Sequence, residues 1–177
     1  MTKKGNQSII LIFLRYLLLL IVALFVISST LFYSLFLKLT IYPVNFLLNF
    51  FYNSEVFGDT ILINGFQISI IPACVAVSAY LLLLILNLTT PIKLEKRIKL
   101  ILLSFLELLG INILRIFILS ILLIQNYVYF DIVHKFFWYF LSTVLVLIIW
   151  FSSTAIFKIR EIPVYSDFRT LIKAIRK

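Results

Sequence analysis

Long apolar stretches constrain this chain more than any other feature of its sequence. Residues 16–37, 72–89, 98–124 and 136–157 each form a mostly apolar run of 18 or more residues. At about 1.5 Å of rise per residue, a helix of about 20 residues crosses a hydrocarbon core of about 30 Å. We therefore expect an all-α polytopic membrane protein with about four transmembrane helices, in a single membrane domain over residues 1–177.

The composition supports this class and excludes several others. Hydrophobic residues make up 63% of the chain, against about 45–50% in soluble domains, and a soluble core of this size has no room for the excess. The single cysteine excludes an internal disulfide, and the single histidine argues against a zinc centre. We see no metal, haem or nucleotide site, so no cofactor is expected.

The basic residues predict the orientation in the membrane. The formal net charge is +9, which in a membrane protein marks cytoplasmic segments facing anionic lipid and not a nucleic-acid site. Lysines and arginines cluster before the first span, between the second and third, and after the fourth. Only Lys38 and Lys135 fall on the other side, and Arg115 lies within the third span. We expect a multi-pass protein of the cell membrane with both termini in the cytoplasm.

Two amphipathic segments are expected to lie on the membrane surface. In the segment 40–53, Thr40 is a candidate helix cap with Pro43 in the first turn, and Asn45 and Asn49 share one face. This predicts a short interfacial helix, or a re-entrant one, and not a span. Near the C-terminus, apolar residues recur at helical spacing between basic residues over 168–177. This pattern predicts a cytoplasmic amphipathic helix on the inner leaflet.

One short stretch has strand character. Ile61 to Ile68 contains two apolar runs separated by Asn64-Gly65, the dipeptide most typical of a two-residue β-hairpin turn. The predicted topology places this hairpin on the outer side. Asn45, Asn49 and Phe66 are candidates for binding an extended peptide, including by addition of a strand to the hairpin.

The only cysteine follows this hairpin and begins the second span. Pro72 suits the first position of a helix, and Cys74 then lies in the first turn. The free N–H groups of a helix N-terminus lower the pKa of a nearby thiol and favour the thiolate. Taken alone, a cysteine in a membrane helix is more often a small apolar filler than a nucleophile.

The third span carries polar residues that need an explanation. An arginine at the centre of a span costs about 2.5–3.5 kcal/mol on insertion scales, so Arg115 is expected to be functional. The alternative is a structural ion pair with Glu107, but eight residues of helix separate these two by about 12 Å. Asn112 is three residues before Arg115 and is expected to steady its guanidinium group.

The only histidine lies at the start of the fourth span. Asp131 is a candidate cap for this helix, which places His134 in its first turn. The topology brings Cys74, Arg115 and His134 to similar depth in the outer leaflet. A thiolate attacks a carbonyl, an imidazole exchanges the proton and a guanidinium stabilises an oxyanion, so the three form a chemical set. Taken singly, the histidine is an ordinary interfacial residue.

These residues resemble those of the exosortase/archaeosortase family. The resemblance covers about residues 61–138: a hairpin before Cys74, then Asn112-Ile113-Leu114-Arg115 in the next span, and His134 at the start of the following one. Family members are polytopic membrane enzymes with an invariant Cys–Arg–His set, proposed to act as cysteine transpeptidases. They often have a glycine where this chain has Ala76, and its short length resembles the compact archaeal members.

The resemblance implies a membrane cysteine protease or transpeptidase. Its substrates would be surface proteins with a C-terminal sorting signal of a short motif, a transmembrane helix and a basic cluster. Cys74 would be the nucleophile, His134 the general base and acid, and Arg115 the oxyanion-stabilising group. Water or an amine, for instance on a membrane lipid, would accept the product. The alternatives are a plain intramembrane protease and a non-enzymatic scaffold in which Arg115 and Glu107 bind partner helices.

Overall fold

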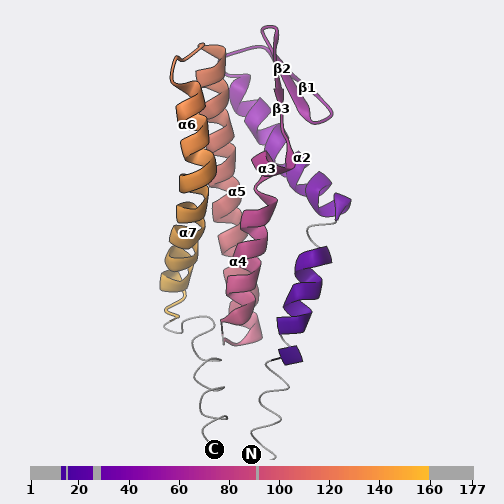
Figure 1. Cartoon of the computed structure of the whole chain (residues 1–177), viewed down its shortest axis with the longest axis vertical. Coiled ribbons are helices and arrows are strands. Elements are labelled where there is room, and N and C mark those ends of the chain that lie inside the picture. Colours follow the sequence, from indigo (N-terminus) through magenta and orange to yellow (C-terminus); the bar gives the residue numbers. More distant parts are fainter. Residues whose placement is uncertain (1–12, 15, 26–28, 91, 160–177) are drawn as a thin grey trace, which may run out of the picture.

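The structure is a computed structural model that describes residues 13–14, 16–25, 29–90 and 92–159. Within these residues the chain is mostly helical, with one small sheet (Figure 1). A short helix, Tyr16–Phe25, precedes the remaining elements. These are α2 (Thr30–Leu48), β1 (Ser54–Phe57), β2 (Thr60–Ile63), β3 (Phe66–Ser69), α3 (Pro72–Val75), α4 (Val77–Thr89), α5 (Leu94–Ile124), α6 (Phe130–Phe136), the π-helical segment η1 (Phe137–Leu141) and α7 (Ser142–Ile156).

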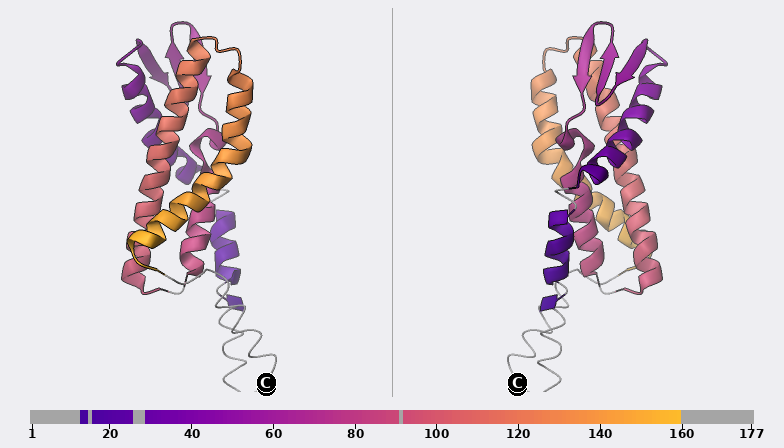
Figure 2. Two further views of the ribbon diagram at one scale, coloured as in Figure 1. Left: turned by 90° about the vertical axis from the view of Figure 1, so that its left-hand side faces the viewer. Right: turned by 90° about the vertical axis from the view of Figure 1, so that its right-hand side faces the viewer.

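Helix α5 forms the centre of the bundle and packs against α2, α4 and α7. The sheet and the α5–α6 loop lie at one end of the molecule, and α4 and α7 end at the other (Figure 1). Helix α6 runs beside the upper part of α5, and α7 slants from the foot of α6 across to the lower part of α5 (Figure 2).

The two faces of α5 show that its surroundings are apolar. Every fourth residue faces the bundle, and this buried stripe alternates apolar and polar side chains: Leu100, Ser104, Leu108, Asn112, Ile116 and Ser120. The outward face carries exposed Leu102, Leu106, Leu114 and Ile118. A helix in water has the reverse pattern. Polar groups inside and leucines outside are typical of a helix that faces lipid.

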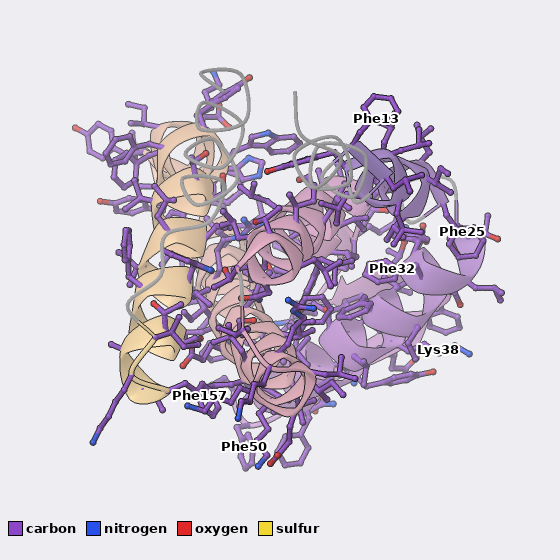
Figure 3. All side chains as sticks on the ribbon, turned by 90° about the horizontal axis from the view of Figure 1, so that it is seen from below. Phe13, Phe25, Phe32, Lys38, Phe50 and Phe157 are labelled. Carbon is purple, nitrogen blue, oxygen red and sulfur yellow. The ribbon has the colours of Figure 1, made fainter. Side chains whose placement is uncertain are left out.

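Three helical stretches are each long and apolar enough to cross a membrane: Thr30–Leu48, Pro72–Thr89 and Leu94–Ile124. The pair Phe130–Phe140 and Ser142–Ile156, bent by 47°, adds a fourth if it acts as one span. Exposed aromatic side chains extend the lipid-facing surface, and Figure 3 shows Phe13 and Phe25 pointing away from the bundle. The chain is therefore of the helical membrane class.

An aromatic cluster holds the helices together in the core. The ring of Tyr80 on α4 is fully buried, and its centroid lies 4.2 Å from that of Phe36 on α2 and 5.1 Å from that of Phe105 on α5. Closer to the end opposite the sheet, the side-chain amide of Asn87 on α4 donates a 2.9 Å hydrogen bond to the hydroxyl of Ser104 on α5. These contacts fix α2 and α4 against α5, the helix that carries Arg115.

The expected helix boundary at Thr40 is wrong. Helix α2 continues without a break through Thr40 and Pro43, so the predicted interfacial helix is the second half of α2. Its N-terminus is capped by Ser29, whose hydroxyl accepts a 3.1 Å hydrogen bond from the Phe32 N–H. Thr40 is fully buried in the middle of the helix. The predicted first span over 16–37 is also wrong in its bounds, because Tyr16–Phe25 is a separate short helix and the stretch long enough to cross a membrane is Thr30–Leu48. Residues 26–28 and the predicted helix at 168–177 lie outside the described residues.

The predicted hairpin is confirmed and has an additional strand. Asn64 and Gly65 have φ values of 48° and 85°, as a two-residue type I′ turn requires, and Ile63 pairs with Phe66. Strand β1 pairs with β2 across Gly58-Asp59, which gives a three-stranded antiparallel sheet in the order β1-β2-β3. This turn is the sequence signal for β1 that the hairpin assignment overlooked.

The predicted helix over Pro72–Thr89 is interrupted two residues after the cysteine. Pro72 begins α3, as expected, but Ala76 has φ 61° and ψ 37° and separates α3 from α4. This left-handed conformation costs a residue with a Cβ atom roughly 1–2 kcal/mol. The bounds of the predicted segment agree with the apolar helical stretch Pro72–Thr89. Its helix is not continuous, however, and Cys74 lies in a single helical turn before the break at Ala76.

The fourth predicted span also begins differently. Helix α6 has Tyr129 at its N-cap position with no side-chain cap, and Asp131 lies inside the first turn, so the prediction that Asp131 caps this helix is wrong. The acidic side chain still lies near the positive end of the helix dipole. The π-helical segment η1 then joins α6 to α7 at the bend.

Candidate active site

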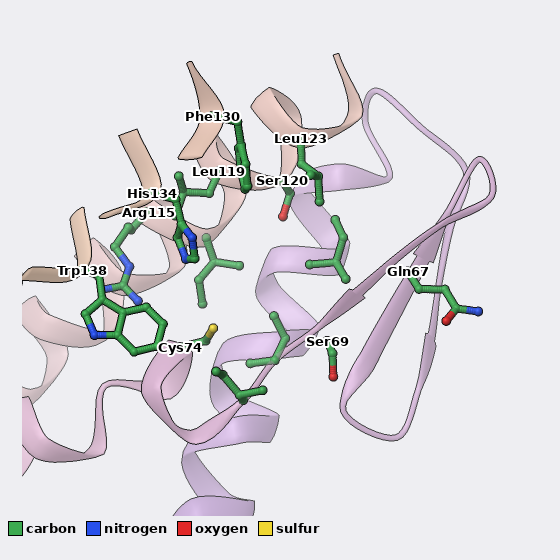
Figure 4. Close-up of a pocket in the computed structure, with 14 residues that line it drawn as sticks. Gln67, Ser69, Cys74, Arg115, Leu119, Ser120, Leu123, Phe130, His134 and Trp138 are labelled. Atoms are coloured by element: carbon green, nitrogen blue, oxygen red, sulfur yellow. The ribbon is translucent and has the colours of Figure 1, made fainter. Parts of the chain in front are cut away.

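Cys74, Arg115 and His134 line one cavity of about 240 Å³ (Figure 4). Its walls come from segments far apart in the sequence: β3 with the residues that follow it, α3, α5, and the α6–η1 segment. The apolar part of the wall includes Ile116, Leu119 and Leu123 of α5. The cavity thus combines three chemically active side chains with a mostly apolar lining.

The α3 turn positions Cys74 at the foot of β3. Its main-chain N–H donates a 2.8 Å hydrogen bond to the Ile71 carbonyl, which closes the turn. Its own carbonyl accepts a 2.8 Å hydrogen bond from the Asn112 side-chain amide. The thiol is free and partly exposed, and Figure 4 shows its sulfur pointing into the cavity. The main-chain N–H and C=O groups of Cys74 are therefore both held by hydrogen bonds, while the sulfur stays accessible.

Asn112 has a different role from the one expected. It lies on the buried face of α5 and is 3% exposed. Sequence analysis assigned it to the guanidinium group of Arg115, but its amide binds the carbonyl of Cys74 across the helix interface. No pattern within α5 could have indicated this partner, because it comes from a turn 38 residues earlier in the chain.

Arg115 enters the cavity without an acidic partner. No carboxylate of the described residues forms an ion pair with it, and its buried Nε atom has no hydrogen-bond partner among them. Glu107 instead accepts hydrogen bonds from the hydroxyls of Ser153, at 2.9 Å, and Ser152, at 3.2 Å, on α7. Arg115 and Glu107 therefore do not form a structural ion pair. This agrees with the prediction from their separation of eight residues along α5.

His134 is held by two aromatic rings on its own face of α6 and η1. Its ring stacks on Phe130, with centroids 5.6 Å apart and planes at 17°, and meets Trp138 edge-on at 5.8 Å and 78°. The three residues are four apart in sequence, so they share one helical face. Phe130 and Trp138 were not predicted as site residues, although their spacing of four from the only histidine is visible in the sequence.

The remaining candidates lie away from this cavity. The Ser54 hydroxyl donates a 2.8 Å hydrogen bond to the side-chain oxygen of Asn45, and the Ser54 N–H donates a 2.9 Å bond to that of Asn49, so these two residues hold β1 at the end of α2. Phe66 begins β3 but is not among the residues that line the cavity, and neither is Asp131. Among the described residues, no group of three histidine, cysteine or carboxylate side chains is placed to hold a metal ion.

No family model, curated protein or solved structure matches this chain. The case for a function therefore depends on the residues and their arrangement.

Tyr33 adds one more contact that holds the segment before Cys74, because its hydroxyl donates a 2.9 Å hydrogen bond to the Ile70 carbonyl just before α3. Helix α2 thus supports the junction between β3 and Cys74, and α5 supports the residue itself.

Proposed function

We propose that this chain is a membrane-embedded cysteine protease or transpeptidase of the archaeosortase type. The observation that carries the proposal is the convergence of Cys74, Arg115 and His134 on one cavity from three separate elements. An arginine within a membrane span that has no acidic partner is costly, and a developing negative charge on a substrate would stabilise it.

The mechanism starts with attack by the Cys74 sulfur on the scissile carbonyl carbon. His134 accepts the thiol proton, and the carbonyl oxygen becomes a tetrahedral oxyanion that the guanidinium group of Arg115 stabilises. The C–N bond then breaks, and His134 gives the proton to the leaving amine. A thioester between Cys74 and the N-terminal part of the substrate remains.

The second half of the reaction releases the thioester. Water gives a hydrolysed product, whereas an amine, for instance on a lipid headgroup, gives an amide and makes the enzyme a transpeptidase. His134 again accepts the proton of the attacking group, and the Cys74 sulfur leaves. The substrate is the C-terminal sorting signal of a surface protein, whose own transmembrane helix brings its motif to the outer leaflet.

The site lies near the outer face in this proposal. Lys93 lies just before α5, and Lys96, Arg97 and Lys99 lie in its first turns, at the end of the molecule opposite the sheet. Such basic segments at the end of a span face the cytoplasm. From Leu94 to Arg115 the helix rises about 32 Å, which places the guanidinium group about one hydrocarbon thickness from the basic end. Both chain termini are then cytoplasmic, and four segments span the membrane.

The proposal is tested by processing of the cognate surface protein in cells that carry single variants. Cys74→Ala and His134→Ala should each abolish or strongly slow processing, with about 10²–10⁴-fold expected for loss of the general base. The new C-terminus of the product, measured by mass spectrometry, separates hydrolysis from transfer. Full processing by a folded Cys74→Ala variant would instead support the scaffold alternative.

A further inference from the structure

Strand β3 is an edge strand, and no strand of the described residues pairs with its outer side. Phe66 pairs with Ile63 across the two-residue turn, and Ile68 pairs with Ile61. The N–H of Ile70 donates a 2.8 Å hydrogen bond to the Asp59 carbonyl and continues the same alternation. In an antiparallel pair, every second residue directs its N–H and C=O groups to the partner strand. Gln67 and Ser69 therefore direct these groups to the open edge.

This open edge forms part of the cavity wall. Gln67 and Ser69 both line the cavity that holds Cys74, Arg115 and His134. Figure 4 shows the side chains of Gln67 and Ser69 pointing away from Cys74 and His134. The N–H and C=O groups that these two residues direct outward therefore belong to the strand that forms this wall. The same strand leads directly through Ile70 and Ile71 to the turn that carries Cys74.

The main-chain groups and side chains that line the cavity favour an extended peptide as the ligand. Unpaired main-chain groups beside an apolar wall are costly, and an extended peptide satisfies them by adding a strand. Arg115 is the charged side chain of the lining, and no carboxylate lies among the lining residues. A peptide main chain is neutral and supplies carbonyl oxygens, so it complements both the edge and the guanidinium group.

We infer that the free edge of β3 binds the substrate as an extended strand, through the main chain of Gln67 and Ser69, and directs its scissile carbonyl to Cys74. The inference deepens the proposed function and rests on it. At about 3.3 Å per residue, a segment of roughly five residues covers the distance from Gln67 to the α3 turn. The sheet is then a peptide-binding device and Cys74 lies at its end.

The test uses the full chain in lipid nanodiscs and two pools of peptide probes. Each pool contains N-acetylated pentapeptides of random sequence that end in a vinyl sulfone, which adds to the Cys74 thiol without a leaving group. In the second pool every backbone nitrogen is methylated, so that it cannot donate a hydrogen bond. Methyl vinyl sulfone, without a peptide, reports the intrinsic reactivity of the thiol. Intact mass gives each alkylation rate.

We expect the unmethylated pool to alkylate Cys74 about tenfold faster than the methylated pool, the effect of one or two net hydrogen bonds. Ser69→Pro removes one outward N–H and should lower the rate with the unmethylated pool about fivefold. Each rate is divided by the rate with methyl vinyl sulfone on the same variant, which removes any change in the intrinsic reactivity of the thiol. Equal rates for the two pools on the parent protein would overturn the inference, even if Ser69→Pro fails to fold.

Val56→Pro is the matched control on the opposite edge of the sheet. Phe57 pairs with Thr60 across the β1–β2 turn, so Val56 directs its N–H outward, away from β2. This variant should keep the full preference for the unmethylated pool. Equal losses in Ser69→Pro and Val56→Pro would contradict a specific role of β3. If methyl vinyl sulfone itself failed to alkylate Cys74 in the parent protein, the proposed function would fail, whatever the pools show.

Discussion

The side-chain amide of Asn112 donates a 2.8 Å hydrogen bond to the main-chain carbonyl of Cys74. This bond joins the long central helix to the four-residue turn that carries the proposed nucleophile. Three residues further along the same helix, Arg115 enters the cavity. One helix therefore positions both the sulfur, through the backbone of Cys74, and the group that would stabilise the oxyanion.

Asn112→Ala should slow the reaction more than its effect on stability explains. The substitution leaves the Cys74 carbonyl without its donor, at a cost of about 1–3 kcal/mol, and loosens the α3 turn. A small displacement of a nucleophile can lower the rate of the chemical step by about 10²-fold. The alkylation rate with methyl vinyl sulfone reports how accessible and reactive the Cys74 thiol is in the loosened turn. The processing rate reports the full loss of activity. Ser104→Ala, which breaks the bond to Asn87 in the same buried stripe, is the control and should lower only stability.

Ala76→Gly should stabilise the folded chain. Ala76 has a φ of 61°, which glycine adopts without the steric cost that a Cβ atom imposes, so the gain should be about 1 kcal/mol. Thermal unfolding in detergent measures it. Ala79→Gly lies inside α4 and should destabilise by about 1 kcal/mol instead. If both glycine variants were destabilised alike, Ala76 would have to be helical in solution.

Arg115→Lys should lose most of the activity although the charge remains. A lysine ammonium is a point charge and does not reproduce the planar, forked donors of a guanidinium group. Removing one oxyanion donor costs about 10²–10³ in turnover, and we expect a loss in this range for Arg115→Ala and a somewhat smaller one for Arg115→Lys. The control is Arg97→Lys on the same helix, where the guanidinium group bonds the Thr90 carbonyl at 3.1 Å. Processing should survive that change.

Glu107→Gln should keep the activity and lose some stability. Glu107 accepts bonds from Ser152 and Ser153 and so connects α5 to α7, well separated along α5 from Arg115. The amide retains one acceptor oxygen, so we expect a loss of about 1 kcal/mol in thermal unfolding and a processing rate within about twofold of the parent. A loss of processing as large as that of Arg115→Ala would instead make Glu107 part of the site.

Local signals in the sequence predicted some of this structure well. The Asn64-Gly65 turn fixes the hairpin because few other residues tolerate a positive φ at two successive positions. Pro72 marks the start of α3 for a similarly local reason. Cys74, Arg115 and His134, which the sequence grouped from three separate spans, line one cavity.

Tertiary contacts decided the features that the sequence did not predict. Thr40 looked like a helix cap, but it is buried in the middle of α2. Alanine favours helices, so nothing in the sequence around Ala76 indicates the break that ends α3. The partner of Asn112 comes from another element of the chain, which helical periodicity cannot reveal.

The central claim is that Cys74 forms a thioester with its substrate, with Arg115 and His134 acting on the same carbonyl. The most direct measurement is the intact mass of the full chain, quenched in acid during turnover of its cognate surface protein. We predict an adduct on Cys74 equal in mass to the N-terminal substrate fragment, released by neutral hydroxylamine and absent from Cys74→Ala. Turnover without an adduct, or with processing retained in Cys74→Ala, would contradict the account.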